Sequence, residues 1–142
     1  MCKGDNFMKK IILLMFLMSQ IIFAKTASWY GKGFEGKLTA SGYVFSSKQL
    51  TCASNRYPFG TVLKVTNKDN DKSVIVVVTD RGSFSEKYGR EIDLSKKAFK
   101  KIADTDEGLI KVDIEVVNKK HIFKYKHGKP KFTKKEYKKF LK

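Results

Sequence analysis

Cysteine is scarce in this 142-residue sequence, which contains only Cys2 and Cys52. Cys2 lies before the first apolar run, so Cys52 is the only thiol in the rest of the chain. One cysteine cannot form an internal disulfide, and the folded part must therefore be stabilised by its own hydrophobic core. We expect Cys52 to be a small buried residue of that core rather than a nucleophile.

Histidine is equally scarce, and the two histidines, His121 and His127, both lie near the C-terminus. Neither belongs to a sequence cluster of cysteines or carboxylates. Structural and catalytic metals are held by several such side chains at characteristic spacings. The sequence therefore predicts no metal site, and we expect no cofactor.

Long hydrophobic runs are missing as well. The longest one, residues 11–18, is too short to cross a bilayer, which takes about 20 apolar residues in a helix. It follows Met8, Lys9 and Lys10, and a second short apolar stretch then ends at the small residue Ala24. This order is typical of a secretory signal peptide, which we expect to comprise residues 1–24, with Met8 as an alternative start. An uncleaved N-terminal anchor is the competing interpretation.

Both interpretations predict an exported protein, in the periplasm or the cell envelope. The residue directly after Ala24 is lysine rather than cysteine, so the sequence does not predict an acylated lipoprotein. Acidic residues are few, 14 against 30 basic ones, and the net charge is +16. Such a charge attracts polyanions. For an exported protein these are wall polymers and anionic lipid headgroups, so we expect no nucleic-acid partner.

Residues 74–78 are five consecutive β-branched residues and predict a strand buried on both faces. This strand leads directly into Asp80, Arg81 and Gly82. Burying a charge is costly unless the charge is paired or used, so Asp80 is a candidate functional carboxylate. A plain turn is the alternative, because Asp and Gly are common turn residues.

Alternating apolar residues predict further strands at 27–31, 61–66 and 110–116. Ser95 is a suitable N-cap for a short helix with one apolar face. Several short strands, glycine-containing turns and one helix predict a single small, mostly-β barrel over residues 25–117.

Residues 118–142 differ in composition, with eleven lysines and one glutamate. Thr133 and Glu136 have the spacing of a capping box, which predicts a short helix near the C-terminus. Two interpretations of this lysine-rich tail remain open. It is either a solvated tail with one docking turn, or an electrostatic tether to an anionic wall polymer or membrane surface.

Six short motifs occur in order between residues 27 and 95. They are Ala27-Ser-Trp-Tyr-Gly31, Thr39-Ala-Ser-Gly42, Pro58-Phe-Gly-Thr61, Val65-Thr-Asn67, Asp80-Arg-Gly82 and Ile92-Asp-Leu-Ser95. Together they resemble the RlpA-like (rare lipoprotein A) family, over roughly residues 26–117. The resemblance implies a six-stranded double-psi β-barrel with one or two short helices.

Members of this family are endolytic lytic transglycosylases that act on peptidoglycan and prefer peptide-free glycan strands. The resemblance implies that Asp80 is the general acid, which protonates the oxygen between N-acetylmuramic acid and N-acetylglucosamine. The muramic 6-hydroxyl would then close on its own anomeric carbon and leave a 1,6-anhydro end. We expect Arg81 to turn away from Asp80 and to pair with Asp93, which would support the site.

The chain departs from the family pattern at three positions. Tyr43 stands where members commonly have Glu, Ser54 where they have His, and Ser83 where they have Pro. A hydroxyl can hydrogen-bond a sugar but cannot replace a carboxylate or imidazole as a base near neutral pH. Asp80 is then the only ionisable catalytic candidate.

These losses leave a second function open, a non-catalytic, expansin-like module that binds wall polysaccharide. Such a module would use Trp29, Tyr30, Tyr43 and Tyr57 as candidate sugar-stacking rings. For Trp29 and Phe59 we expect a place in the core instead, because aromatic residues are ordinary core residues. The candidate substrate contacts are Tyr30, Tyr43, Ser54, Tyr57 and Arg81.

Overall fold

The computed structural model describes residues 3–18, 25–84 and 89–142. The helix α1 (Lys3–Met18) lies in the region predicted as a signal peptide. Its side chains are exposed from Asp5 to Met15. Within the described ranges, no helix is both long enough and apolar enough to cross a membrane.

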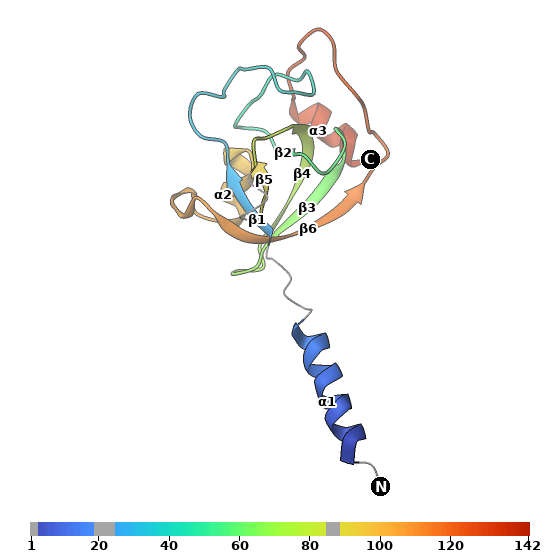
Figure 1. The fold of residues 1–142 in the computed structure, drawn as a ribbon. Coiled ribbons are helices and arrows are strands. Elements are labelled where there is room, and N and C mark those ends of the chain that lie inside the picture. The colour runs from blue at the N-terminus through green and yellow to red at the C-terminus, as the bar shows by residue number, and fades with distance from the viewer. Residues whose placement is uncertain (1–2, 19–24, 85–88) are drawn as a thin grey trace.

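Six strands make up the folded part of the chain (Figure 1). They are β1 (Lys25–Trp29), β2 (Thr51–Ser54), β3 (Val62–Asn67), β4 (Ser73–Asp80), β5 (Arg90–Leu94) and β6 (Ile110–Asn118). The strands predicted from alternation and from the β-branched run are confirmed, although β1 begins and ends two residues earlier than expected.

The strands close into a barrel in the order β1-β5-β2-β4-β3-β6. The pairs β1–β5 and β2–β4 are parallel, whereas every other neighbouring pair is antiparallel. A closed barrel leaves no exposed sheet edge. The mostly-β class and the six-stranded double-psi barrel are both confirmed.

The two faces of β4 pack against different partners. Val74, Val76 and Val78 point into the barrel, in a core that also contains the fully buried Cys52. Ile75 and Val77 point outward and belong to a second apolar cluster. The predicted burial on both faces is therefore confirmed in outline, and it requires a cover on the outer side of the barrel wall.

The helix α2 (Lys96–Ile102) contributes to the barrel core. It begins at Ser95, whose side chain accepts a hydrogen bond from the Ala98 amide as predicted for an N-cap. Phe99 and Ile102 are fully buried and complete the interior. A short 3-10 turn, Thr105–Glu107, connects α2 to β6.

The lysine-rich residues 119–142 supply the cover for the outer face of β4. The helix α3 (Lys134–Leu141) begins at the predicted cap Thr133 and lies beside the barrel wall in Figure 1. Phe132 and Phe140 are buried against Val62 and Val77 in the second apolar cluster. The segment is therefore packed onto the barrel, with its lysines on the outside.

Two motif glycines allow this segment to approach the barrel closely. Gly42 has φ +92°, and a Cβ on it would lie 2.1 Å from the Lys126 carbonyl oxygen. Gly60 has φ +89°, and its Cβ would lie 2.3 Å from the His121 carbonyl oxygen. Both positions therefore need glycine for the backbone conformation and for the space.

Candidate functional site

A cavity of about 330 Å³ opens beside the C-terminal end of β4. It combines an aromatic side with a charged side, and small-molecule sites combine apolar walls with a few polar groups in the same way. Its lining comprises Trp29, Tyr30, Gly31, Phe34, Asp80, Arg81, Gly82, Ser83, Arg90 and Asp93.

Asp80 is fixed in this cavity by three hydrogen bonds. One carboxylate oxygen accepts from the amides of Ala40 and Arg81, at 2.9 and 2.8 Å. The other accepts from the hydroxyl of Tyr30 at 2.9 Å. The side chain is half-buried, so its carboxylate is held in one orientation while remaining accessible from the cavity.

Tyr30 acts as a donor to Asp80. Burial raises the pKa of its phenol far above the ordinary value of 10.0, and the negative charge of Asp80 raises it further. The hydroxyl therefore stays protonated at physiological pH. Its ring packs against Phe45 and Phe34, with centroids 4.4 and 5.5 Å away, and this packing fixes the hydroxyl position.

Arg81 turns away from Asp80, as expected, but its predicted pairing with Asp93 is wrong. One guanidinium nitrogen donates to the carbonyl oxygens of Ser54 and Tyr57, at 2.7 and 2.8 Å. The guanidinium also lies over the Phe59 ring, 4.0 Å from its centroid. The planar guanidinium is thus used to fasten the loop after β2 rather than to neutralise a carboxylate.

Asp93 has a different partner, Arg90, on the same strand. The guanidinium donates to both carboxylate oxygens, at 2.8 and 3.0 Å. Ser28 on the adjacent β1 accepts from Arg90 at 2.9 Å and donates to Asp93. Both bonds to the carboxylate come from the Nη2 nitrogen, while Nε is used for Ser28. Asp93 therefore has a structural role, and its partner is Arg90 rather than Arg81.

Two predicted substrate contacts lie outside the cavity. Tyr43 is 1% exposed, and its ring packs against Phe123, Phe132 and Phe140 under residues 119–142. Ser54 is also 1% exposed. The prediction that these side chains contact substrate is corrected, because neither is accessible.

Tyr30 and Arg81 are brought together at the cavity, whereas Tyr57 is half-buried against the barrel core and does not line it. The expectation that Trp29 is a core residue holds in part, since it packs on Phe99 and also borders the cavity. Cys52 is fully buried, and burial raises the pKa of its thiol, so it is not a nucleophile.

The sequence did not indicate three residues that contribute to this site. Ala40 acts through its backbone amide, which no side-chain pattern reveals. Phe34 is 48% exposed at the aromatic side of the cavity, in a glycine-containing loop without periodicity. Arg90 could have been considered, because it is a basic residue only three positions before Asp93 and two before the Ile92–Ser95 motif.

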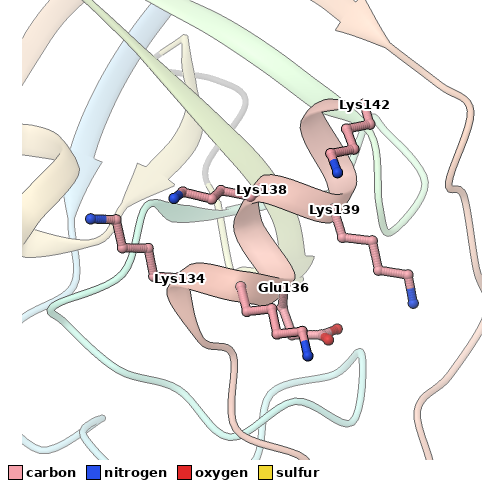
Figure 2. A pocket seen from close by; sticks show the side chains of 6 residues that line it. Lys134, Glu136, Lys138, Lys139 and Lys142 are labelled. Atoms are coloured by element: carbon pink, nitrogen blue, oxygen red, sulfur yellow. The ribbon is translucent and has the colours of Figure 1, made fainter.

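A larger hollow of about 650 Å³ lies over α3. It shares no lining residue with the cavity that contains Asp80. Its lining consists of Lys134, Lys135, Glu136, Lys138, Lys139 and Lys142. Figure 2 shows that Lys138 and Lys139 point to opposite sides of the helix, so the amino groups do not converge on one point. This is a diffuse cationic surface rather than a shaped pocket.

No metal centre competes with these two sites in the described part of the chain. There, His, Cys, Asp and Glu do not form any group of three or more able to hold a metal ion.

Comparison with known proteins agrees with the geometry. The family described as "Lytic transglycolase" matches residues 22–114. The chain belongs to this RlpA-like family. The match includes Asp80 and ends before β6 does, so residues 119–142 lie beyond it.

Curated relatives point to the same family. The chain is 48% identical over 95 residues to the endolytic peptidoglycan transglycosylase RlpA of Rickettsia bellii, covering 65% of this chain and 41% of the relative. It is 46% identical over 91 residues to the RlpA of Vibrio cholerae, covering 64% and 34% respectively. The chain thus spans well under half of each relative.

A solved structure supports the fold of this family member. The expansin of Clavibacter michiganensis superposes with a TM-score of 0.53 and 25% identity, covering 70% of this chain and 52% of the expansin. The same barrel therefore occurs in a protein with a different name, and a shared fold alone does not assign a reaction.

Proposed function

We propose that the barrel is a peptidoglycan lytic transglycosylase. Its substrate would be a glycan strand, preferably free of peptides, cleaved between N-acetylmuramic acid and N-acetylglucosamine. Support comes from one observation above all. Asp80 lies in an accessible cavity, oriented by three donors, at the motif position that the family resemblance assigns to the acid.

Asp80 is the better candidate of the two cavity carboxylates. Both oxygens of Asp93 accept hydrogen bonds from Arg90. Asp80 accepts hydrogen bonds but has no ion pair among the described residues. A general acid must reach the oxygen that it protonates. The Asp93 side chain is only 14% exposed and is held by Arg90, so it is less able to do so.

The proposed step needs only one carboxyl group. Asp80 donates its proton to the glycosidic oxygen as the bond from that oxygen to the muramic C1 breaks. The 6-hydroxyl oxygen of the same muramic residue bonds to C1, and its proton returns to Asp80. No water is consumed, no net proton is released, and the products are a 1,6-anhydro end and a free 4-hydroxyl.

The experiment compares the protein with its Asp80→Asn variant on peptide-free glycan strands, with products identified by mass spectrometry. Asp113→Asn on β6 is the matched control, because it removes an exposed carboxylate far from the cavity lining. We expect anhydro products from the protein and the control only. Products from Asp80→Asn would exclude Asp80 as the acid.

An expansin-like binding module is the second candidate. Two observations favour it. The first is the exposed ring of Phe34, which packs on the buried Tyr30 at the aromatic side of the cavity. The second is the presence of hydroxyl residues at the family Glu and His positions. In the same experiment, retained binding of glycan strands by the protein without any cleavage would support this candidate and contradict the transglycosylase.

We also propose that the protein is exported to the periplasm or cell envelope. The support is the basic start, the short apolar run and the small residue at Ala24. Cell fractionation with N-terminal sequencing of the isolated protein tests this. A cytoplasmic protein beginning at Met1 or Met8 would contradict it.

We further propose that the cationic surface over α3 binds an anionic polymer of the cell envelope. Five of the nine residues from Lys134 to Lys142 are lysines. Their amino groups spread outward rather than converge (Figure 2). Such a surface suits a long polyanion with repeated charges. The apolar face of α3 is packed on the barrel through Phe140 and cannot insert into a lipid bilayer.

Charge removal tests this surface better than deletion, because deletion would uncover the apolar cluster. The variant carries Lys134→Gln, Lys135→Gln, Lys138→Gln and Lys139→Gln. The control removes four exposed lysines from α2, with Lys96→Gln, Lys97→Gln, Lys100→Gln and Lys101→Gln. We expect weaker, salt-sensitive binding to polyphosphate only for the α3 variant. Equal losses, or binding to anionic vesicles but not to the polymer, would contradict the proposal.

A further inference from the structure

We infer that residues 119–142 take part in positioning Asp80, through a hydrogen bond between Tyr43 and Glu136. This inference rests on the proposed function of Asp80. It assigns Tyr43 and Glu136 as positioning residues, since neither lines the cavity that contains Asp80.

The first link joins the barrel to α3. The Tyr43 hydroxyl donates to the Glu136 carboxylate at 2.7 Å. Burial raises the pKa of the Tyr43 phenol, and the Glu136 hydrogen bond and charge raise it further, so the hydroxyl remains a donor. Glu136 itself lies in the first turn of α3, where the helix dipole favours a carboxylate.

The second link is the turn formed by residues 39–43. The Tyr43 carbonyl oxygen accepts from both the amide and the hydroxyl of Thr39, at 2.9 and 2.7 Å. The Gly42 amide donates to the Thr39 carbonyl at 3.0 Å. The position of Tyr43 therefore determines how the turn is closed.

The third link reaches the carboxylate. Within this turn, the Ala40 amide donates to Asp80 at 2.9 Å. The next amide, that of Ser41, donates to the Thr79 carbonyl at 3.2 Å. The turn is thus attached to the end of β4 at two consecutive residues, one of which is Asp80.

Residues 119–142 hold the turn from its other side. The Lys126 amide donates to the Ser41 carbonyl at 2.8 Å, and the Val44 amide donates to the Pro130 carbonyl at 2.9 Å. Gly42 lies between these two bonds, against the Lys126 carbonyl. The turn is therefore clamped between β4 and the C-terminal segment, with the Tyr43–Glu136 bond at its end.

Small displacements matter in such an arrangement. A catalytic group moved by about 1 Å can lose a large part of its rate, because the reacting atoms must be aligned. Loosening of the turn would remove the Ala40 amide from Asp80 and leave its carboxylate less well oriented. Glycan binding in the cavity would be changed far less, because the lining residues other than Asp80 stay in place.

Tyr43→Phe tests the inference, since it removes the hydroxyl and keeps the ring among Phe123, Phe132 and Phe140. We expect kcat to fall about tenfold with KM unchanged. We also expect faster hydrogen exchange of the Ala40 amide, measured by NMR. Glu136→Gln should retain activity, because the glutamine side-chain oxygen can still accept the hydrogen bond from the Tyr43 hydroxyl.

Tyr137→Phe is the matched control. Tyr137 also lies on α3 and donates its hydroxyl to the barrel, to the Ile75 carbonyl at 2.9 Å, but it has no bond to the turn. We expect Tyr137→Phe to lose about as much stability as Tyr43→Phe, while its kcat and its Ala40 amide exchange stay normal.

The outcomes separate this inference from the proposed reaction. Unchanged Ala40 exchange in Tyr43→Phe overturns the inference whether or not the protein cleaves glycan. Equal losses of kcat in Tyr43→Phe and Tyr137→Phe also overturn it, because general destabilisation would then explain both. If the unaltered protein is inactive, the proposed reaction fails, and the exchange data alone decide whether Tyr43 holds the turn.

Discussion

Asn55 and Gly82 exchange two hydrogen bonds between the loops that follow β2 and β4. The Gly82 amide donates to the Asn55 side-chain oxygen at 3.0 Å, and the Asn55 side-chain nitrogen donates to the Gly82 carbonyl at 2.6 Å. The Asn55 side chain therefore continues the link between β2 and β4 beyond the point where their backbone hydrogen bonds end. The loop containing Arg81 is fastened two residues beyond Asp80.

We predict that Asn55→Ala lowers the proposed activity, because the loop beside Asp80 loses both bonds. The stability loss should be about 1 kcal/mol, since these groups can turn to water. Urea unfolding and glycan cleavage measure the two effects. Asn70→Ala is the control, because it removes a side-chain bond to the Ile102 carbonyl, away from the cavity. Equal effects on activity would contradict a local role for Asn55.

The raised pKa of Tyr30 predicts a loss of stability at alkaline pH. The folded state holds the phenolic proton more tightly than the unfolded state, whose tyrosine titrates near 10.0. Stability from this group is therefore complete below pH 10 and falls as the pH rises above it, by about 1.4 kcal/mol per pH unit at most. Tyr30→Phe removes this contribution. Between pH values below and above 10, the urea midpoint should fall less for Tyr30→Phe than for the unaltered protein. An equal fall in both proteins would contradict a stabilising role for the Tyr30 proton.

The packing of residues 119–142 predicts unequal effects of two neighbouring substitutions. Phe140 is 4% exposed in the second apolar cluster, whereas Leu141 is 40% exposed. Phe140→Ala should cost about 3 kcal/mol through cavity formation. Leu141→Ala should change stability by about 0.5 kcal/mol or less. Similar small losses would show that the C-terminal segment does not support the barrel.

Much of the barrel could be predicted because its strands carry strong local patterns. The β-branched run of β4 and the alternation in β3 and β6 each determine which side chains face the core. The cover over Ile75 and Val77 could not be predicted in the same way. It comes from Phe123, Phe132 and Phe140, which are separated by irregular chain and have no common period.

The candidate site was predictable at Asp80 and less so around it. A motif gives the order of residues but not the side of the barrel wall to which each side chain points. Tyr43 follows Gly42, whose positive φ turns the chain, and its ring lies under the C-terminal segment rather than in the cavity. Arg81 likewise bonds to two backbone carbonyls contributed by the distant loop after β2.

The geometry of Arg81 predicts that Arg81→Lys is not a conservative change. Lysine keeps the positive charge but cannot reproduce the planar contact with Phe59 or the directed bonds from one nitrogen to the Ser54 and Tyr57 carbonyls. We expect a stability loss of about 1 kcal/mol and a reduced kcat, because the loop adjoining Asp80 is no longer fastened. Urea unfolding and glycan cleavage test both. If charge alone mattered, Arg81→Lys would match the unaltered protein in stability and kcat, whereas Arg81→Gln would lose both. Losses of similar size in the two variants would instead show that the guanidinium geometry is required.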